Sequence, residues 1–224
     1  MTAVSGAIGK FSISKAHKAQ KYLSKKIIIE DRFPNKISFV AGVDVAYAGD
    51  LAVGAAAVLD YETLETLEVQ TATCKVRFPY VPTLLSFREV PPSVACIKRL
   101  KRQPDVLLVD GQGVAHPYRC GFASHLGLAI SKPTVGVAKS RLSGDIMNGF
   151  LVENGQVIGA VVTTHEGQKP VYVSVGHLIS LETAMQIVRR CFRRSRMPEP
   201  IWQAHCLAKL ERQRLCRRVG LEKV

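Results

Sequence analysis

The stretch PDVLLVDGQGVAHPYRCGFASHLGLAI, residues 104–130, constrains the fold more than any other part of the chain. Val106–Val109 is a short apolar run rich in β-branched residues, bounded by Pro104 and by a glycine-containing loop, and this pattern predicts a buried strand. After Pro117, apolar residues recur at helical spacing up to Ile130. The stretch therefore predicts a strand–loop–helix unit whose loop carries polar groups, and open α/β sheets bind ligands at such loops.

The chain before this unit predicts three antiparallel strands. Ile37–Tyr47, Leu51–Leu59 and Leu64–Phe78 are β-rich runs separated by short turn signals, and consecutive strands so connected usually pair. A basic amphipathic helix is predicted ahead of them at Ser14–Asp31.

Helices and strands alternate in the rest of the chain. The loop Phe78–Pro82 is stiffened by two prolines, and a helix is predicted to begin at Pro91-Pro92 and to run to about Arg102. Further strands are expected near Thr134–Val137, Phe150–Val152, Val157–Thr163 and Val171–Val175, and two basic helices at Leu181–Arg194 and Pro200–Arg218. This order predicts an α/β fold with a mixed central sheet flanked by helices, in a single domain spanning residues 1–224.

The net charge of +13 is concentrated at the two ends of the chain. Residues 1–36 carry eight lysines and arginines against two acids, and residues 186–224 carry eleven against three. Two basic ends around a near-neutral middle indicate surfaces for a polyanion, most often nucleic acid. The alternative is that these charges belong only to solvated helix faces.

Other features place the protein among ordinary globular proteins of a reducing compartment. Six scattered cysteines form no metal-binding spacing, so free thiols are predicted. No apolar run is long enough to cross a bilayer and no signal peptide is evident, so a cytoplasmic protein without membrane contact is expected. No coiled-coil repeat is present, and a monomer is expected.

Three acids stand at positions that suit a ligand site. Asp44 lies inside an apolar strand, on the face that it shares with the small residues Gly42 and Ala46; Glu89 precedes a predicted helix, and Asp110 ends the buried strand. A carboxylate in an apolar strand is costly unless a cation meets it. Carboxylates without thiolates favour Mg²⁺ or Mn²⁺, which suits phosphodiester hydrolysis by a basic protein.

Each acid also has a simpler interpretation. Asp44 could face solvent on an edge strand, Glu89 could stabilise a helix N-terminus, and Asp110 could cap its loop. The sequence therefore supports a nuclease hypothesis that depends on the three acids converging in space.

A series of motifs strengthens this hypothesis. The chain contains, in order, FVAGVDVAY, PYVP, FRE at Phe87–Glu89, VDGQGVAHP with GFASHLG, GVAKSRL and VSVGHLISLETA, which cover most of Phe39–Ala184. A late motif, EPIWQAHCLA, occupies Glu199–Ala208. This succession resembles the motifs of the endonuclease V family.

The resemblance implies an RNase H-like fold and a DNA-repair endonuclease of the deoxyribonuclease V type. Such an enzyme depends on Mg²⁺, with Mn²⁺ as a substitute, and recognises hypoxanthine in deoxyinosine or inosine. It cleaves the second phosphodiester bond 3′ to that base and leaves a 3′-hydroxyl and a 5′-phosphate. The resemblance makes Asp44, Glu89 and Asp110 the catalytic acids and metal ligands, and it adds His205 and Lys139 to the catalytic residues.

The same resemblance implies the substrate-binding residues. Tyr80, held between Pro79 and Pro82, becomes the wedge that fills the gap left by the flipped base, and stacking suits this role. Backbone groups around Gly111 and Gly113 are expected to form a pocket that rejects the amino group of guanine.

The remaining expectations concern phosphate contacts. His116 is expected to bind a phosphate or orient a carboxylate, or else to be a structural histidine of a tight loop. Lys139 is expected to neutralise the phosphate at the cut, or to be an ordinary surface lysine. The loop departs from the family pattern at Tyr118 and Cys120, which leaves Arg119 as its candidate phosphate contact.

Three alternatives stay open from the sequence. The substrate could be DNA or inosine-containing RNA, because the contacts to the 2′-hydroxyl that would decide this are not readable. The chain could be a non-catalytic nucleic-acid-binding protein of the same fold. It could also be another RNase H-like nuclease that reads strand structure rather than a modified base.

Overall fold

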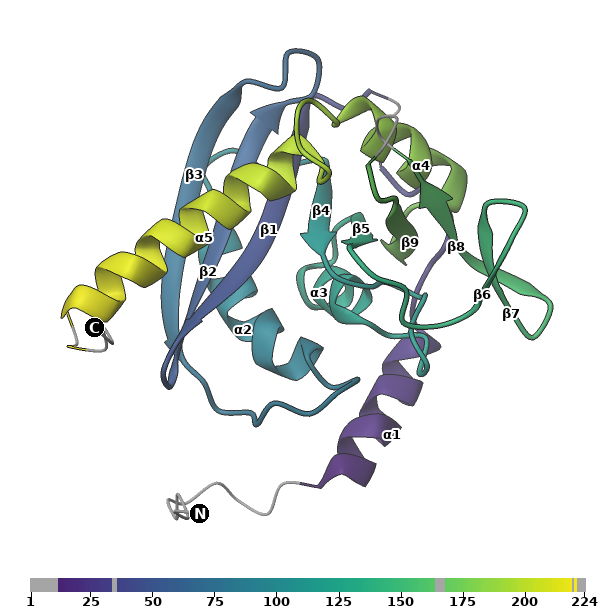
Figure 1. The fold of residues 1–224 in the computed structure, drawn as a ribbon, viewed down its shortest axis with the longest axis horizontal. Helices are drawn as coiled ribbons and strands as arrows, with labels where there is room; N and C mark the ends of the chain where they lie inside the picture. Colours follow the sequence, from purple (N-terminus) through teal and green to yellow (C-terminus); the bar gives the residue numbers. More distant parts are fainter. Residues whose placement is uncertain (1–11, 34–35, 164–167, 219, 221–224) are drawn as a thin grey trace.

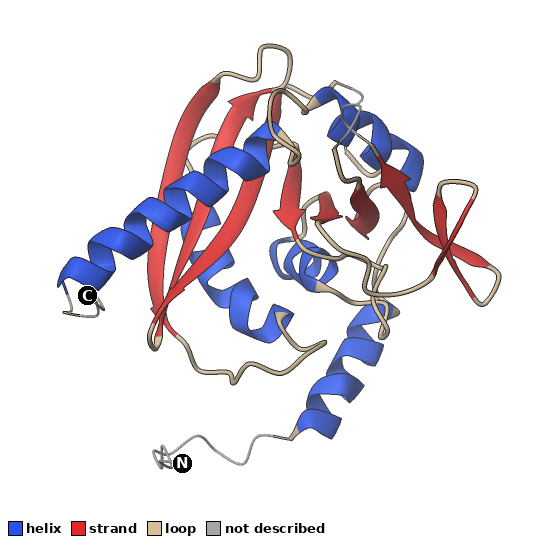
Figure 2. Ribbon diagram, in the orientation of Figure 1, coloured by secondary structure: helices blue, strands red, loops and turns tan. Residues whose placement is uncertain are grey.

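The computed structural model describes residues 12–33, 36–163, 168–218 and 220. Within these ranges, nine strands form one sheet with the order β3-β2-β1-β4-β5-β9-β8-β7-β6. Figure 2 draws the strands in red and the helices in blue. The strands are β1 (Phe39–Ala48), β2 (Leu51–Asp60), β3 (Thr66–Lys75), β4 (Val106–Asp110), β5 (Thr134–Ala138), β6 (Asp145–Met147), β7 (Phe150–Glu153), β8 (Gln156–Val162) and β9 (Val171–His177). The helices are α1 (Ile13–Ser24), α2 (Ser86–Ile97), α3 (Phe122–Ile130), α4 (Leu181–Arg190) and α5 (Glu199–Arg218).

The sheet combines antiparallel and parallel pairs. Strands β1, β2 and β3 form an antiparallel meander, while β4 runs parallel to β1 and β5 runs parallel to β4. From β5 onward the sheet is antiparallel again, through β9, β8, β7 and β6. The predicted mixed sheet, with three antiparallel strands followed by helix–strand units, is confirmed.

Helices cover both faces of the sheet, and each face has its own apolar core. One core joins inward side chains of β1, β4, β5 and β9 to α4 and α5. The other joins the opposite side chains of β1, β2 and β4 to α2 and α3. Figure 1 shows α5 lying diagonally across the meander, with α2 and α3 behind the sheet. The alternation of side chains along a strand divides β1 between these two cores.

Some predicted boundaries were wrong. Helix α2 begins at Ser86, so Pro91 and Pro92 lie inside it and do not start it. Neither proline can donate to the carbonyl one turn earlier. Pro91 is exposed, whereas Pro92 is buried on the sheet, where it meets Gly54 of β2. Helix α1 ends at Ser24, well before the predicted Asp31. Strand β6 was not predicted.

Two of the composition-based predictions can be compared with the structure. All six cysteines are free, and three of them, Cys96, Cys120 and Cys191, are buried. Within the described ranges, no helix has both the length and the apolar character needed to cross a membrane.

Candidate metal centre and adjoining cavity

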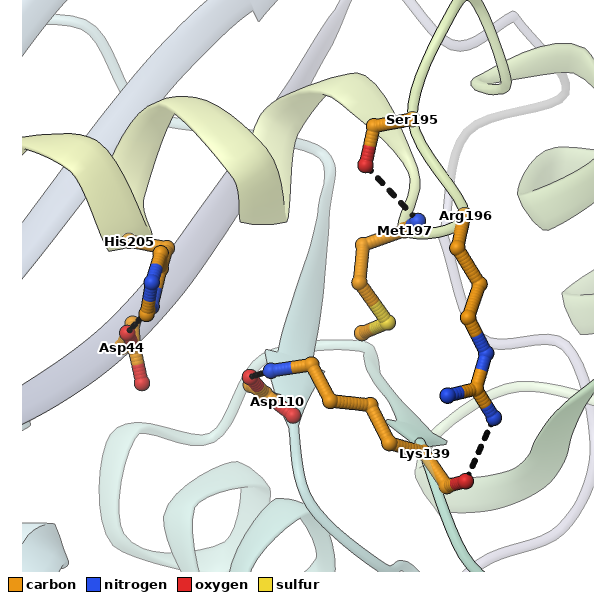
Figure 3. Close-up of polar contacts among 7 residues, drawn as sticks. All are labelled: Asp44, Asp110, Lys139, Ser195, Arg196, Met197 and His205. Atoms are coloured by element: carbon orange, nitrogen blue, oxygen red, sulfur yellow. Dashed lines mark hydrogen bonds and ion pairs between the residues drawn. The ribbon is translucent and has the colours of Figure 1, made fainter. Parts of the chain in front are cut away.

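Three side chains from distant parts of the chain meet where β4 ends beside the middle of β1. Asp44, Asp110 and His205 each offer one ligand atom, and these atoms all lie within 4.8 Å of one another. The Nδ1 atom of His205 is 2.8 Å from Oδ2 of Asp44 (Figure 3). Carboxylate oxygens are the ligands that Mg²⁺ and Mn²⁺ prefer, and imidazole is a common ligand of divalent transition metals, so these residues fit a divalent cation.

The register of the sheet places the two aspartates together. Strands β1 and β4 are parallel, and their pairing ends with Val43 opposite Val109. The next residue on each strand is Asp44 and Asp110. Neighbouring strands are about 4.8 Å apart, so the two carboxylates are close enough to share a cation.

Helix α5 brings the histidine over this pair. A Cβ atom on Gly42 would lie 1.9 Å from the carbonyl oxygen of Pro200, so the first turn of α5 rests directly on β1 at this glycine. His205 follows Pro200 by about one and a half turns and thereby reaches Asp44, two residues beyond Gly42 on the same strand face. Helix α5 thus packs against β1 at Gly42, whereas Ala46, on the same strand face, lines an open groove.

Lys139 completes the polar cluster from the other side of Asp110. It follows the last residue of β5, and its Nζ donates to Oδ2 of Asp110 at 2.6 Å. The guanidinium of Arg196 donates to the carbonyl of Lys139 at 2.5 Å (Figure 3). It also donates to the carbonyls of Lys169 and Pro170. Arg196 therefore fixes the backbone from which Lys139 reaches the carboxylate.

Glu89 lies close to this cluster but outside its closest set of ligand atoms. Its carboxyl sits in the first turn of α2 and is 8% exposed. Burial, followed by the nearby carboxylates of Asp44 and Asp110, raises the pKa of Glu89 to about 8. Burial and the carboxylate of Asp110 also raise the pKa of Asp44. Because these carboxyl groups resist ionisation, a bound cation would stabilise their charged forms strongly.

A cavity of about 410 Å³ opens next to Asp110. Its walls include Tyr80 and Pro82 from the loop before α2, and Gly111, His116 and Lys139. Tyr80 is 69% exposed, so its ring stands at the rim rather than in the core. Pro79 is exposed beside it.

Helix α1 holds the walls of this cavity from outside. The side chain of Gln20 is fully buried and donates to the carbonyl of Thr83 at 2.7 Å and to that of Cys120 at 3.1 Å. One turn earlier, His17 is 3.1 Å from the Thr83 hydroxyl, and its ring stacks on Tyr118. The two loops on either side of the cavity are therefore joined through one helix.

His116 has the environment of a structural histidine. It is 4% exposed, and its Nδ1 accepts a hydrogen bond from the backbone N–H of Tyr118. Burial lowers the pKa of His116 to about 4, and a hydrogen bond to the Thr83 backbone only partly opposes this. At neutral pH the ring is uncharged and braces the loop, while one edge faces the cavity.

Two predicted contact residues lie apart from the cavity. Gly113 packs on β9, where a Cβ atom would lie 2.0 Å from the carbonyl oxygen of Val175, and its N–H donates to Ser174 Oγ. That N–H is thus engaged within the protein, whereas Gly111 does line the cavity. Arg119 forms an ion pair of 2.7 Å with Glu153 on β7.

Sequence reasoning missed several residues of this region. Gln20 could not be singled out, because its partners are carbonyls far along the chain. Lys209 and Arg212 lie beside Asp44 and His205 in a separate groove, and their spacing of four and seven residues from His205 on a helix was a usable signal.

A mixed sheet flanked by helices, with carboxylates on two neighbouring parallel strands and a histidine over them, defines an RNase H-like protein with a possible metal site. Comparison with known proteins gives the family. The family model described as Endonuclease V matches residues 21–206, and the chain belongs to this family. An Endonuclease V of Thermofilum pendens is 47% identical in an alignment of length 204 that covers 88% of each chain.

Solved structures agree with this assignment. The catalytic domain of human Endonuclease V superposes with a TM-score of 0.84 at 29% identity, over 96% of this chain and 100% of that one. Ciona intestinalis Endonuclease V, solved with a 23-mer DNA that contains an inosine followed by a ribo-adenosine, gives a TM-score of 0.83 at 32% identity, over 93% of this chain and 100% of that one. The predicted family and the RNase H-like fold are confirmed.

Proposed function

We propose that this protein is a Mg²⁺-dependent endonuclease that binds hypoxanthine in a nucleic-acid strand and cuts the second phosphodiester bond 3′ to it. One observation carries the proposal. Asp110 belongs both to the candidate metal centre and to the wall of the cavity that Tyr80 overhangs. A base held in that cavity would place its own strand beside the metal centre. The relative from Ciona intestinalis, which was solved with inosine-containing DNA, supports the same substrate.

The residues present suit the steps of this reaction. Asp44, Asp110 and His205 would hold the ion, with Glu89 close by, and the ion when bound would activate water and stabilise the leaving oxygen. Lys139 would offset the negative charge of the phosphate next to Asp110. Tyr80 would stack where the extruded base has left the helix, which is worth about 1–3 kcal/mol per stacked base.

The test uses end-labelled DNA and RNA strands of one sequence, each with a single hypoxanthine or with adenine in its place. Cleavage is measured with Mg²⁺, with Mn²⁺ and with EDTA. We expect metal-dependent cutting at a fixed offset 3′ to hypoxanthine, and the ratio between the two strands gives the preferred sugar. If no strand is cut while salt-sensitive binding persists, the protein is a non-catalytic nucleic-acid-binding protein and the proposed activity is wrong.

Two variants separate the metal centre from the cavity. Asp110→Asn should lower the cleavage rate by at least about 10³-fold while binding of the hypoxanthine strand persists, because a metal ligand is lost. Tyr80→Ala should weaken binding of the hypoxanthine strand by roughly tenfold and leave the metal requirement unchanged. Equal cutting of hypoxanthine and adenine strands by wild type would argue against base recognition and for a nuclease that reads strand structure.

A further inference from the structure

A second groove of about 480 Å³ begins at the metal centre and follows α5. Asp44 and His205 form one end of it, and Lys209 and Arg212 form the other. His205, Lys209 and Arg212 are spaced four and three residues apart, so they lie along one face of the helix. The groove is distinct from the cavity that Tyr80 overhangs, because Asp44 and His205 line the groove and Asp110 lines the cavity.

The two basic residues of this groove are exposed and have no acidic partner within the described part of the chain. Two other cations of this region are already engaged in ion pairs: Lys139 with Asp110, and Arg214 of α5 with Glu211. A phosphate chain that enters the groove can therefore meet Lys209 and Arg212 without breaking an ion pair. Both also lie beyond residue 206, where the match to the family model ends.

The order of the three sites along the molecule indicates which end of a bound strand would enter the groove. The cavity, the metal centre and the groove follow one another, and Figure 3 shows Asp110 between Lys139 on one side and Asp44 with His205 on the other. A strand whose modified base sits in the cavity, and which is cut 3′ to that base, must leave the metal centre on the far side. The groove is on that side.

We infer that Lys209 and Arg212 bind the phosphates of the strand immediately 3′ to the cleaved bond. This inference rests on the proposed function. Seven residues of helix from His205 to Arg212 cover about 10 Å, which equals roughly three nucleotides of a stacked strand at 3.4 Å each. The groove thus holds a short 3′ segment and keeps the scissile phosphate seated over the carboxylates.

The test combines a double variant, Lys209→Gln/Arg212→Gln, with two hypoxanthine substrates. One substrate continues well past the cut, and the other ends one nucleotide beyond it. Wild type should cut the long-arm substrate with a kcat/KM roughly tenfold above that of the truncated one. In the double variant this advantage should disappear, because only the long arm reaches the groove.

Salt dependence gives a second readout on binding alone. Affinity for the long-arm strand is measured in EDTA against salt concentration, and the slope of log affinity on log salt should be less steep by about 1.4 in the double variant, since two phosphate contacts are lost. The control is Lys98→Gln/Lys101→Gln, which removes the same charge from exposed positions just after the C-terminal end of α2. This control should keep both the long-arm advantage and the wild-type slope.

The inference would be overturned by an equal loss in the double variant on long and truncated substrates, or by an effect that follows the length of the 5′ arm. Wild type that cuts both substrates equally well would overturn it too, while leaving the proposed function intact. Failure of wild type to cut any hypoxanthine strand would instead count against the proposed function.

Discussion

At the scale of single residues, the metal centre is an arrangement of carboxylates that the metal-free protein holds at a cost. Glu89 and Asp44 are both harder to ionise than ordinary carboxyls, because they are buried and face other carboxylates. Lys139 relieves this repulsion only at Asp110. A divalent cation is the group that would relieve it for the whole cluster.

This repulsion predicts the pH dependence of metal-free stability. The pKa of Glu89 is about 8 in the folded protein and near 4.5 when unfolded, so its carboxyl destabilises the fold progressively as pH rises from 4.5 to 8. In EDTA, the free energy of unfolding should fall over that window by on the order of a few kcal/mol. Glu89→Gln should flatten the profile, as measured by urea unfolding at several pH values.

The matched control for this measurement is Glu62→Gln. Glu62 is exposed in the turn between β2 and β3, and its removal should leave the wild-type profile in place. A Glu89→Gln profile that falls as steeply as wild type would show that the buried carboxyl is not the source of the pH dependence.

At the scale of elements, local pattern predicted the strands well and the long-range contacts hardly at all. The runs around β1, β2 and β4 have β-branched residues and turn signals at their ends, so their positions were readable. The start of α2 was not, because packing of Pro92 on β2 outweighs the local preference against proline inside a helix.

The candidate site also combines features that the local sequence predicted with features that only the tertiary contacts show. The alternation along β1 placed Asp44 opposite the face that Ala41 and Val43 bury, but only the parallel register with β4 shows that it meets Asp110. His205 was singled out through its motif, whereas its position over Asp44 depends on the contact between Gly42 and Pro200. The role of α1 in holding the cavity walls had no local signal, since the hydrogen bonds of Gln20 span 63 and 100 residues.

The role of α1 gives a prediction about specificity. Gln20→Leu keeps side-chain volume but removes the donor shared by the Thr83 and Cys120 carbonyls, which should lower the free energy of unfolding by about 1–3 kcal/mol. Because the cavity walls are no longer joined, the ratio of cleavage on hypoxanthine and adenine strands should fall severalfold. Lys18→Leu, at an exposed position of the same helix, is the control.

Metal-dependent stabilisation separates this effect from general damage. If α1 acts only on the cavity, the increase in Tm on adding Mn²⁺ should be the same for Gln20→Leu and wild type. A variant with reduced stability but unchanged discrimination would show that Gln20 contributes to folding alone.

At the scale of the whole molecule, the metal centre is a junction between distant parts of the chain. Asp44 and Asp110 come from two strands of the sheet, and His205 comes from a helix 161 residues further on than Asp44. A cation bound to all three would tie α5 to the sheet as well as prepare the active site. Since the same helix carries Lys209 and Arg212, its seating couples the metal centre to the groove that we assign to the 3′ strand.

This junction predicts that divalent cations stabilise the fold. At a concentration one hundred times the Kd, a ligand that binds only the folded state contributes about 2.7 kcal/mol, which for a chain of this length raises Tm by roughly 5–10 °C. The measurement is thermal unfolding with Mg²⁺ or Mn²⁺ against NaCl at equal ionic strength, because screening among the many positive charges also changes stability. Asp44→Asn should lose the cation-specific part of the shift and be more stable than wild type without metal, since it removes a buried carboxyl that resists ionisation. An equal cation-specific shift in wild type and Asp44→Asn would mean that the ion binds elsewhere, and the assignment of the centre to Asp44, Asp110 and His205 would fail.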